Sequence, residues 1–171
     1  MPTSTKLANS TMSTTSRLIL TLPDEAATGS FGRLLGARLP VPLVIGLSGE
    51  LGAGKTTLSQ GIGAGFGIDG PMPSPTFTLI NEYLGPRGRL YHLDLYRLND
   101  LDELLDLGLD DLLAQPDALL LVEWIDRFAI WPEGPERLDI QLNHQPGGRR
   151  LELQLPPVCQ KLEAQLRTWT P

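Results

Sequence analysis

The segment that most constrains this chain spans residues 49–56 and reads GELGAGKT. It follows an apolar run at 41–47, which predicts a strand buried on both faces, and it precedes residues 57–66, which predict a helix. The P-loop pattern is a glycine followed by any four residues and then Gly-Lys-Thr, placed between a strand and a helix. Glycines let successive backbone N–H groups surround a phosphate, and the helix N-terminus adds partial positive charge. The segment therefore predicts a phosphate-binding loop in an α/β fold.

The residue types of this loop suit a magnesium nucleotide. Lys55 would reach the β- and γ-phosphates, and the Thr56 hydroxyl would bind the Mg²⁺ that bridges them. The sequence contains no Asn-Lys-x-Asp segment for reading guanine, so we expect ATP or ADP with Mg²⁺ rather than GTP. The loop residues predicted to bind the nucleotide are Gly49, Gly52, Ala53, Gly54, Lys55, Thr56 and Thr57.

Other patterns along the chain complete the α/β plan. Strands are predicted at 17–22, 76–84, 89–98, 118–123, 137–143 and 149–155, and helices at 26–38 and 101–113, the second broken near Gly108. Turn sequences at 85–88 and 146–148 predict two hairpins, so part of the sheet should be antiparallel. We expect a P-loop NTPase-like three-layer fold with a mixed, partly antiparallel central sheet.

The length of 171 residues suits one such domain, expected at 17–156. Residues 1–16 are rich in Ser and Thr and predict a disordered leader, with a transit peptide as the alternative, and 157–171 form a C-terminal tail. Apolar runs are too short to span a bilayer, so no membrane is expected. The single cysteine excludes an internal disulfide, which favours a reducing, cytoplasmic location.

The net charge of −6 argues against direct binding of tRNA or other nucleic acid, because such binding depends on Lys and Arg that neutralise phosphates. Ten of the 20 acidic residues lie within 94–126. A solvated helical face is the plain interpretation of this cluster, and a docking surface for a basic partner is the other.

Two acids are candidates for the metal site of a P-loop enzyme. Glu123 is favoured because it follows the apolar run 118–122, which would deliver its carboxylate to the sheet edge where ligands of parallel sheets bind. The second acid is Asp94, which strand alternation places on one face with His92 and Tyr96. This face either lines a site or faces solvent. His92 is more readily a structural histidine than a base.

Two further residues have roles that the pattern alone leaves open. Thr76 follows Pro-Ser-Pro just beyond the P-loop helix, where many nucleotide hydrolases place a mobile loop whose Thr senses the γ-phosphate. Trp124 either covers the site or packs as an ordinary core residue.

Four segments in this order resemble the TsaE family: 49–57, SPTFTL at 74–79, YHLDLYRL at 91–98 and VEW at 122–124. The family comprises bacterial ATPases of tRNA threonylcarbamoyladenosine biosynthesis, and the resemblance covers about residues 18–155. It implies an ATPase that works with the TsaD and TsaB proteins, reaches tRNA only through them, and supports the N6-threonylcarbamoyladenosine (t6A) modification of adenosine 37.

The resemblance also assigns residues. It implies that Asp94 and Glu123 are metal-site acids beside Thr56, that Thr76 belongs to a switch-like loop, and that Trp124 lies beside the nucleotide. By the same resemblance, Glu25, Gly148 and Arg149 would lie near the adenine or ribose. Ile125 stands where many members have Pro, which leaves the path of the next loop open.

Two other functions use the same loop. A small-molecule kinase would need a lid of arginines that clamps the transferred phosphoryl group, and Arg87, Arg89 and Arg97 are the candidates near in sequence. A nucleotide-gated adaptor would need binding without functional turnover.

Overall fold

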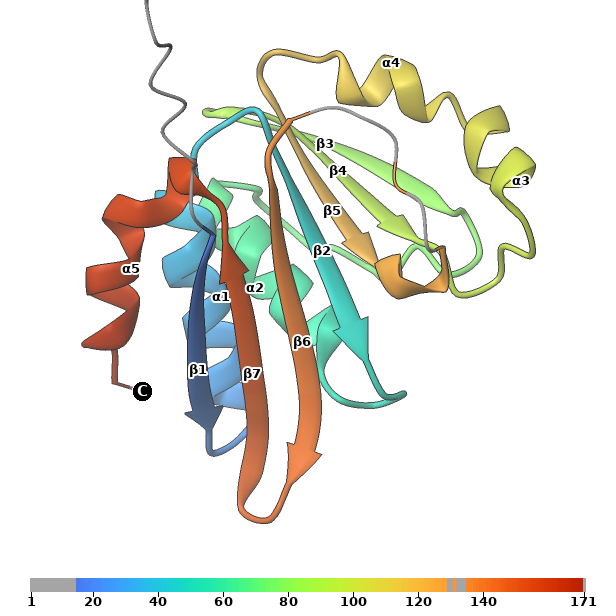
Figure 1. The fold of residues 1–171 in the computed structure, drawn as a ribbon. Coiled ribbons are helices and arrows are strands. Elements are labelled where there is room, and N and C mark those ends of the chain that lie inside the picture. Colours follow the sequence, from blue (N-terminus) through green and yellow to red (C-terminus); the bar gives the residue numbers. More distant parts are fainter. Residues whose placement is uncertain (1–14, 129–130, 132–134, 171) are drawn as a thin grey trace, which may run out of the picture.

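The computed structural model describes residues 15–128, 131 and 135–170 (Figure 1), and nearly all of the predicted leader 1–16 lies outside them. The elements of the described part are β1 Ser16–Leu22, α1 Glu25–Arg38, β2 Leu43–Gly49, α2 Lys55–Phe66, β3 Ile80–Gly85, β4 Gly88–Asp94, α3 Leu101–Asp106, α4 Leu109–Leu113, β5 Ala118–Glu123, the 3-10 turn η1 Ile125–Arg127, β6 Arg137–Gln145, β7 Gly148–Leu155, the 3-10 turn η2 Pro157–Cys159 and α5 Gln160–Arg167.

One mixed sheet organises the described residues, with the strand order β1-β7-β6-β2-β5-β4-β3. The centre is parallel: β2 lies between β5 and β6, and β4 pairs with the other side of β5. Both margins are antiparallel, because β3 forms a hairpin with β4 while β7 pairs with β6 and β1. The predicted mixed, partly antiparallel sheet is confirmed.

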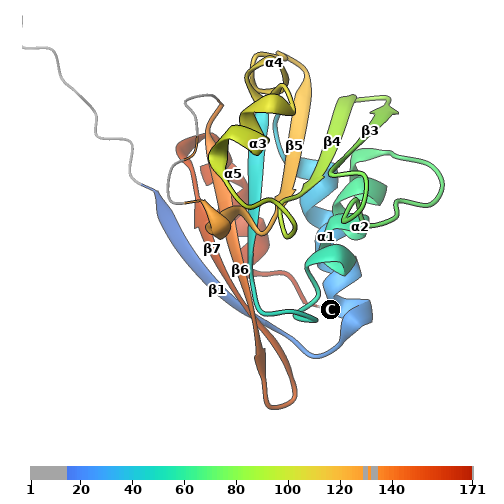
Figure 2. The same ribbon diagram turned by 90° about the vertical axis from the view of Figure 1, so that its right-hand side faces the viewer.

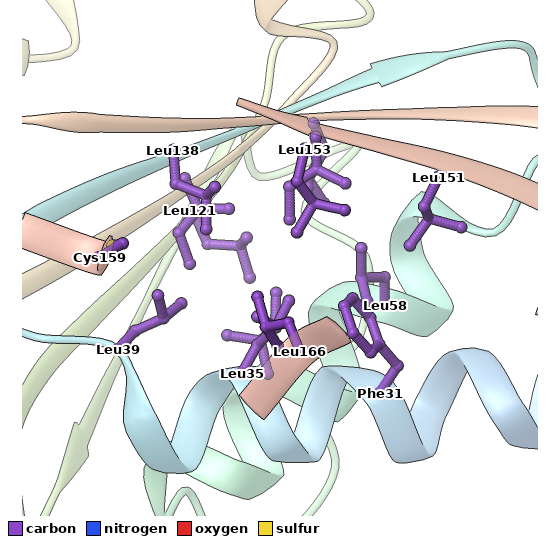
Figure 3. Packing of buried hydrophobic residues seen from close by; sticks show 14 of the residues in the cluster. Phe31, Leu35, Leu39, Leu58, Leu121, Leu138, Leu151, Leu153, Cys159 and Leu166 are labelled. Atoms are coloured by element: carbon purple, nitrogen blue, oxygen red, sulfur yellow. The ribbon is translucent and has the colours of Figure 1, made fainter. Parts of the chain in front are cut away.

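Helices cover both faces of this sheet and create three layers. Figure 2 shows α1 and α2 on one side of the sheet and α3 and α4 on the other. The larger core lies beneath α1, α2 and α5, where side chains from the sheet meet Phe31, Leu35 and Leu166 (Figure 3). The smaller core joins α3 and α4 to β4, β5 and part of β2. P-loop NTPase-like architecture therefore follows from the order and packing of these elements.

Helices α1 and α2 pack so closely that their backbones nearly touch. A Cβ atom added to Gly36 would lie 1.9 Å from the carbonyl oxygen of Ile62, and one added to Gly65 would lie 2.1 Å from that of Arg33. Only glycine permits this approach. The start of α1 follows from sequence, since Asp24 caps it by accepting a hydrogen bond of 2.7 Å from the Ala27 N–H.

Two predicted strands proved too long. Residues 76–79 form a turn rather than the start of β3, with a hydrogen bond from the Leu79 N–H to the Pro75 carbonyl and a positive φ of 66° at Leu79. Strand β4 ends at Asp94 rather than at residue 98, because the Asp94 side chain accepts a hydrogen bond from the Tyr96 N–H and turns the chain. Tyr96 therefore lies outside the strand alternation that the sequence suggested.

The segment predicted as a C-terminal tail contains ordered structure. Cys159, Leu162 and Leu166 are buried in the larger core, and Trp169 packs edge-on against Phe31 with ring centroids 5.1 Å apart. Among the helices of the described residues, none combines the length and the apolar character that a membrane crossing requires.

Candidate functional site

The P-loop connects β2 to α2 in the backbone geometry that a phosphate nest needs. Gly54 precedes α2 with φ 104°, and Gly49 ends β2 with φ 124°. A side chain at Gly49 would place its Cβ atom 1.9 Å from the Leu142 carbonyl oxygen on β6. The loop therefore depends on glycine both for its left-handed torsions and for its contact with the neighbouring strand.

Lys55 is buried at the first turn of α2. Its Nζ donates hydrogen bonds of 2.8 Å to the carbonyl oxygens of Gly49 and Glu50 and lies 3.6 Å from the centroid of the Trp124 ring. Burial lowers the pKa of Lys55 from its usual range, and nearby carboxylates, Glu123 foremost, act in the opposite direction. The ammonium group is thus held at the loop by carbonyl dipoles and an aromatic face.

Glu123 ends β5 beneath the P-loop helix and is 2% exposed. One carboxylate oxygen accepts a hydrogen bond of 3.0 Å from the Thr56 hydroxyl. The other accepts a hydrogen bond of 3.0 Å from Ser59 and lies 2.8 Å from Nε2 of His92. Both oxygens are therefore fixed by side chains of α2 and β4.

Asp94 ends β4 as the register partner of Glu123 on β5. Its Oδ2 accepts a hydrogen bond of 2.6 Å from the Thr76 hydroxyl, and Ser74 lies 3.4 Å from the same oxygen. The Tyr96 N–H binds Oδ1 at 2.9 Å. The loop that contains Thr76 is thus tied directly to the second carboxylate of the site.

Trp124 lies immediately after Glu123 with a positive φ of 62°. This left-handed conformation is unusual for a large side chain, and here it turns the indole over the Lys55 ammonium group. The Tyr96 ring packs against Trp124 with centroids 5.0 Å apart. The aromatic pair forms one wall of the site.

The opposite rim comes from α1 and β7. Arg149 donates a hydrogen bond of 3.0 Å from Nε to the Ala53 carbonyl, so the start of β7 is attached to the P-loop. Gly148 packs against the end of β1, where a Cβ atom would lie 2.1 Å from the Leu22 carbonyl oxygen. Glu25, at the start of α1, lies 3.4 Å from the Thr57 hydroxyl.

These elements enclose a cavity of about 360 Å³. Most of the residues that the sequence nominated line it, and Gly49, Ala53 and Gly148 belong to its backbone framework. The lining residues are Glu25, Leu51, Gly52, Gly54, Lys55, Thr56, Thr57, Ser74, Thr76, Asp94, Tyr96, Glu123, Trp124 and Arg149.

Sequence reasoning missed the supporting residues Ser59 and Ser74, whereas Tyr96 lines the cavity, one of the two positions that the sequence left open for it. Ser59 had a usable signal, because it lies four residues after Lys55 and so on the same face of α2. The pairing of His92 with Glu123 had no local signal, since it depends on β4 lying beside β5.

The donor atoms of the cavity suit Mg²⁺ with a nucleotide. Mg²⁺ prefers oxygen ligands and is usually held by one or two carboxylates together with substrate phosphates. Thr56 supplies a hydroxyl, and Asp94 and Glu123 supply carboxylates, in the same cavity that Lys55 lines. No group of three or more metal-binding His, Cys, Asp or Glu side chains occurs within 15–128, 131 and 135–170.

This fold and this site define a P-loop NTPase-like protein. The structure resembles the crystal structure of YdiB from Bacillus subtilis with a TM-score of 0.65 and 28% identity, over 88% of this chain and 97% of that one. The family model described as "Threonylcarbamoyl adenosine biosynthesis protein TsaE" matches residues 22–151. The chain therefore belongs to the TsaE family.

Curated relatives agree with this assignment. A protein of Haemophilus influenzae named "tRNA threonylcarbamoyladenosine biosynthesis protein TsaE" is 36% identical over 77% of this chain and 85% of its own length. A protein of the same name from Synechocystis is 56% identical over 81 residues. That match spans 47% of this chain and about half, 52%, of the Synechocystis protein.

Proposed function

We propose that this protein binds ATP with Mg²⁺ in the cavity and hydrolyses it in support of tRNA t6A biosynthesis. The observation that carries the proposal is the register of β4 and β5, which places Asp94 beside Glu123 in the cavity that Lys55 also lines. One basic group and two acids at a P-loop are the parts that phosphoryl transfer needs.

Each group of residues in the cavity has a separate role in this proposed reaction. The loop N–H groups and Lys55 bind the phosphates, and Lys55 exchanges its bonds to the loop carbonyls for bonds to phosphate oxygens. Thr56, Asp94 and Glu123 would hold Mg²⁺ directly or through its water shell, and the ion would neutralise charge on the phosphates. Glu123, already fixed by three side chains, orients the attacking water.

Trp124 and Tyr96 exclude solvent from this wall of the cavity, while Glu25 and Arg149 at the far rim contact the nucleoside. Thr76 releases Asp94 when its hydroxyl turns to the bound nucleotide, so the loop around it responds to the γ-phosphate.

We further propose that TsaD and TsaB are the partners and that tRNA is reached only through them, in the cytoplasm. The net charge of −6 opposes direct phosphate contact. Helices α3 and α4 present acids such as Asp102, Asp106 and Asp110, which suit a basic docking surface on a partner.

Two of the three arginines that a kinase lid would need have hydrogen-bond partners elsewhere. Arg87 donates hydrogen bonds to the carbonyls of Gly36 and Leu39, and Arg89 pairs with Glu82. These contacts favour hydrolysis over transfer to a small-molecule acceptor.

Reconstituted tRNA modification tests the proposal. TsaD and TsaB supplied with a suitable tRNA should complete few rounds of modification, and addition of this protein with ATP and Mg²⁺ should sustain the reaction. The Lys55→Ala protein should not. Sustained modification with that variant, or tight tRNA binding by the isolated chain at physiological salt, would contradict it.

A further inference from the structure

His92 is a buried polar residue behind the proposed site, and it does not reach the cavity. Its side chain is 0% exposed, and Nε2 lies 2.8 Å from the Glu123 carboxylate. Its Nδ1 is buried and has no hydrogen-bond partner among the described residues. Its ring therefore makes a single polar contact, and that contact is with the proposed metal-site acid.

This arrangement selects one tautomer of the imidazole ring. With the proton on Nε2, the ring donates to the carboxylate and leaves only an acceptor without a partner at Nδ1. With the proton on Nδ1, that buried N–H would have no acceptor. In addition, the lone pair of Nε2 would point at a lone pair of the carboxylate oxygen, which is repulsive. Of the two neutral tautomers, the geometry therefore favours the Nε2–H form.

We propose that His92 is a positioning residue that fixes the Glu123 carboxylate toward Thr56 and the cavity. Ser59 and His92 bind the same oxygen of Glu123, from α2 and from β4 respectively. The other oxygen is left to face Thr56. This inference rests on the proposed hydrolytic function and adds a residue to it.

The role differs from general support of the fold. The ring of His92, on β4, makes its polar contact with β5 through the Glu123 carboxylate. Its register partner on β5 is Leu121, which is apolar and offers no hydrogen bond from its side chain. Loss of the donor leaves one carboxylate oxygen with Ser59 alone, so the group can rotate away from Thr56. Removal of a residue that hydrogen-bonds a metal-ligating or catalytic side chain commonly lowers activity roughly 10- to 100-fold.

Turnover measurements in the presence of TsaD and TsaB test this. His92→Leu removes the donor and should lower kcat roughly 10- to 100-fold with KM for ATP changed less than about twofold. His92→Gln places an amide N–H near the position of Nε2 and should restore most of kcat. Leu121→Val, a neighbouring core change, should lower Tm and leave kcat within about twofold.

A second background separates positioning from stability. In Glu123→Gln, His92→Leu should have little further effect on kcat, because the group that it positions is already altered. Additive losses, or no rescue by His92→Gln, would overturn the inference. Wild-type turnover in Glu123→Gln itself would instead overturn the proposed hydrolytic role of Glu123.

A spectroscopic measurement needs no turnover. Nitrogen–proton correlation spectra of the nucleotide-free protein should show His92 as a single Nε2–H tautomer, and Glu123→Ala should abolish that preference. His144, the other histidine of the chain, is exposed and serves as the internal control with mixed, exchanging tautomers. An Nδ1–H form, or a pattern like that of His144, would overturn the inference.

Discussion

The ammonium group of Lys55 lies 3.6 Å from the centre of the Trp124 ring while it donates to two carbonyls of its own loop. Lys55, the residue proposed to bind the phosphates, is thus already in contact with Trp124, the residue that should cover the nucleotide. Arrival of phosphate oxygens would replace the carbonyls as acceptors, so Lys55 and Trp124 should respond together.

Removal of the Lys55 charge should weaken nucleotide binding. Lys55→Ala is expected to lower affinity for ATP and ADP roughly 10- to 100-fold, because charge-assisted bonds to phosphate are lost. Titration with a fluorescent ATP analogue measures this. Lys161→Ala alters an exposed lysine of α5 and should bind like wild type. Equal affinities for both variants would contradict the P-loop assignment.

Replacement of either strand-end acid should separate binding from turnover. Asp94→Ala and Glu123→Ala are expected to lower kcat by roughly one to several orders of magnitude while nucleotide still binds, because these acids act most strongly in the transition state. Steady-state turnover assays beside binding titrations measure both quantities. Asp69→Ala, at an exposed acid that follows α2, is the matched control. If both site variants keep full turnover, the metal site is elsewhere.

Sequence patterns were sufficient where a segment carried its own signal. Strand β5 has the predicted bounds because its apolar run ends at a single acid, and the hairpin turn at 85–88 follows from its glycines and proline. The predicted start of β3 was wrong because Thr76 binds Asp94, a residue 18 positions away. Hydroxyl groups that bind distant side chains leave no mark on local periodicity.

The residues of the candidate site also fall into two groups, those with a local sequence signal and those without one. The P-loop residues could be found from their spacing, since one local segment supplies them all. The hydrogen bonds of Glu123 to Thr56, Ser59 and His92 join three elements that are distant in sequence. Their assembly depends on sheet order, which sequence spacing does not encode. The role of Asp94 as a neighbour of Glu123 is a consequence of the same sheet order.

The contact between α1 and α2 should make two glycines of one helix respond oppositely to alanine. Gly36→Ala would place a methyl group 1.9 Å from the Ile62 carbonyl oxygen, whereas the Cβ position of Gly29 has no atom within 4 Å. We expect Gly36→Ala to destabilise the protein by about 1–3 kcal/mol or more. Gly29→Ala should stabilise it by about 0.5–1 kcal/mol, because alanine favours helix.

Urea unfolding of the two variants measures the difference. If Gly36→Ala were as stable as Gly29→Ala, the close approach of the helices would be contradicted.

Cys159 should make stability depend on alkaline pH. Burial raises the pKa of its thiol from an ordinary value of 9.0 to about 11. Between these values the unfolded chain loses the proton while the folded protein keeps it, so the free energy of unfolding should fall as pH rises through this window. The decline contributed by one such group is at most about 1.4 kcal/mol per pH unit.

Comparison with Cys159→Ala isolates this effect, because the variant keeps every other titrating group. Urea unfolding at about pH 8 and about pH 10.5 should show a steeper loss for wild type. Native protein should also resist iodoacetamide, which needs the thiolate. Identical pH dependence in the two proteins, or rapid alkylation of folded wild type, would contradict the burial of this thiol.

The pairing of β1 with β7 places Ser16 opposite Leu155 and Leu22 opposite Arg149. A ribosome therefore makes β1 long before it makes β7, the strand that pairs with β1 in the described part of the chain. Until β7 emerges, the apolar side chains of Leu18 and Leu22 have no strand beside them, and the nascent protein must wait in an incomplete state. Premature termination before residue 149 would leave both β1 and the outer edge of β6 unpaired, which marks such fragments for chaperones and proteases.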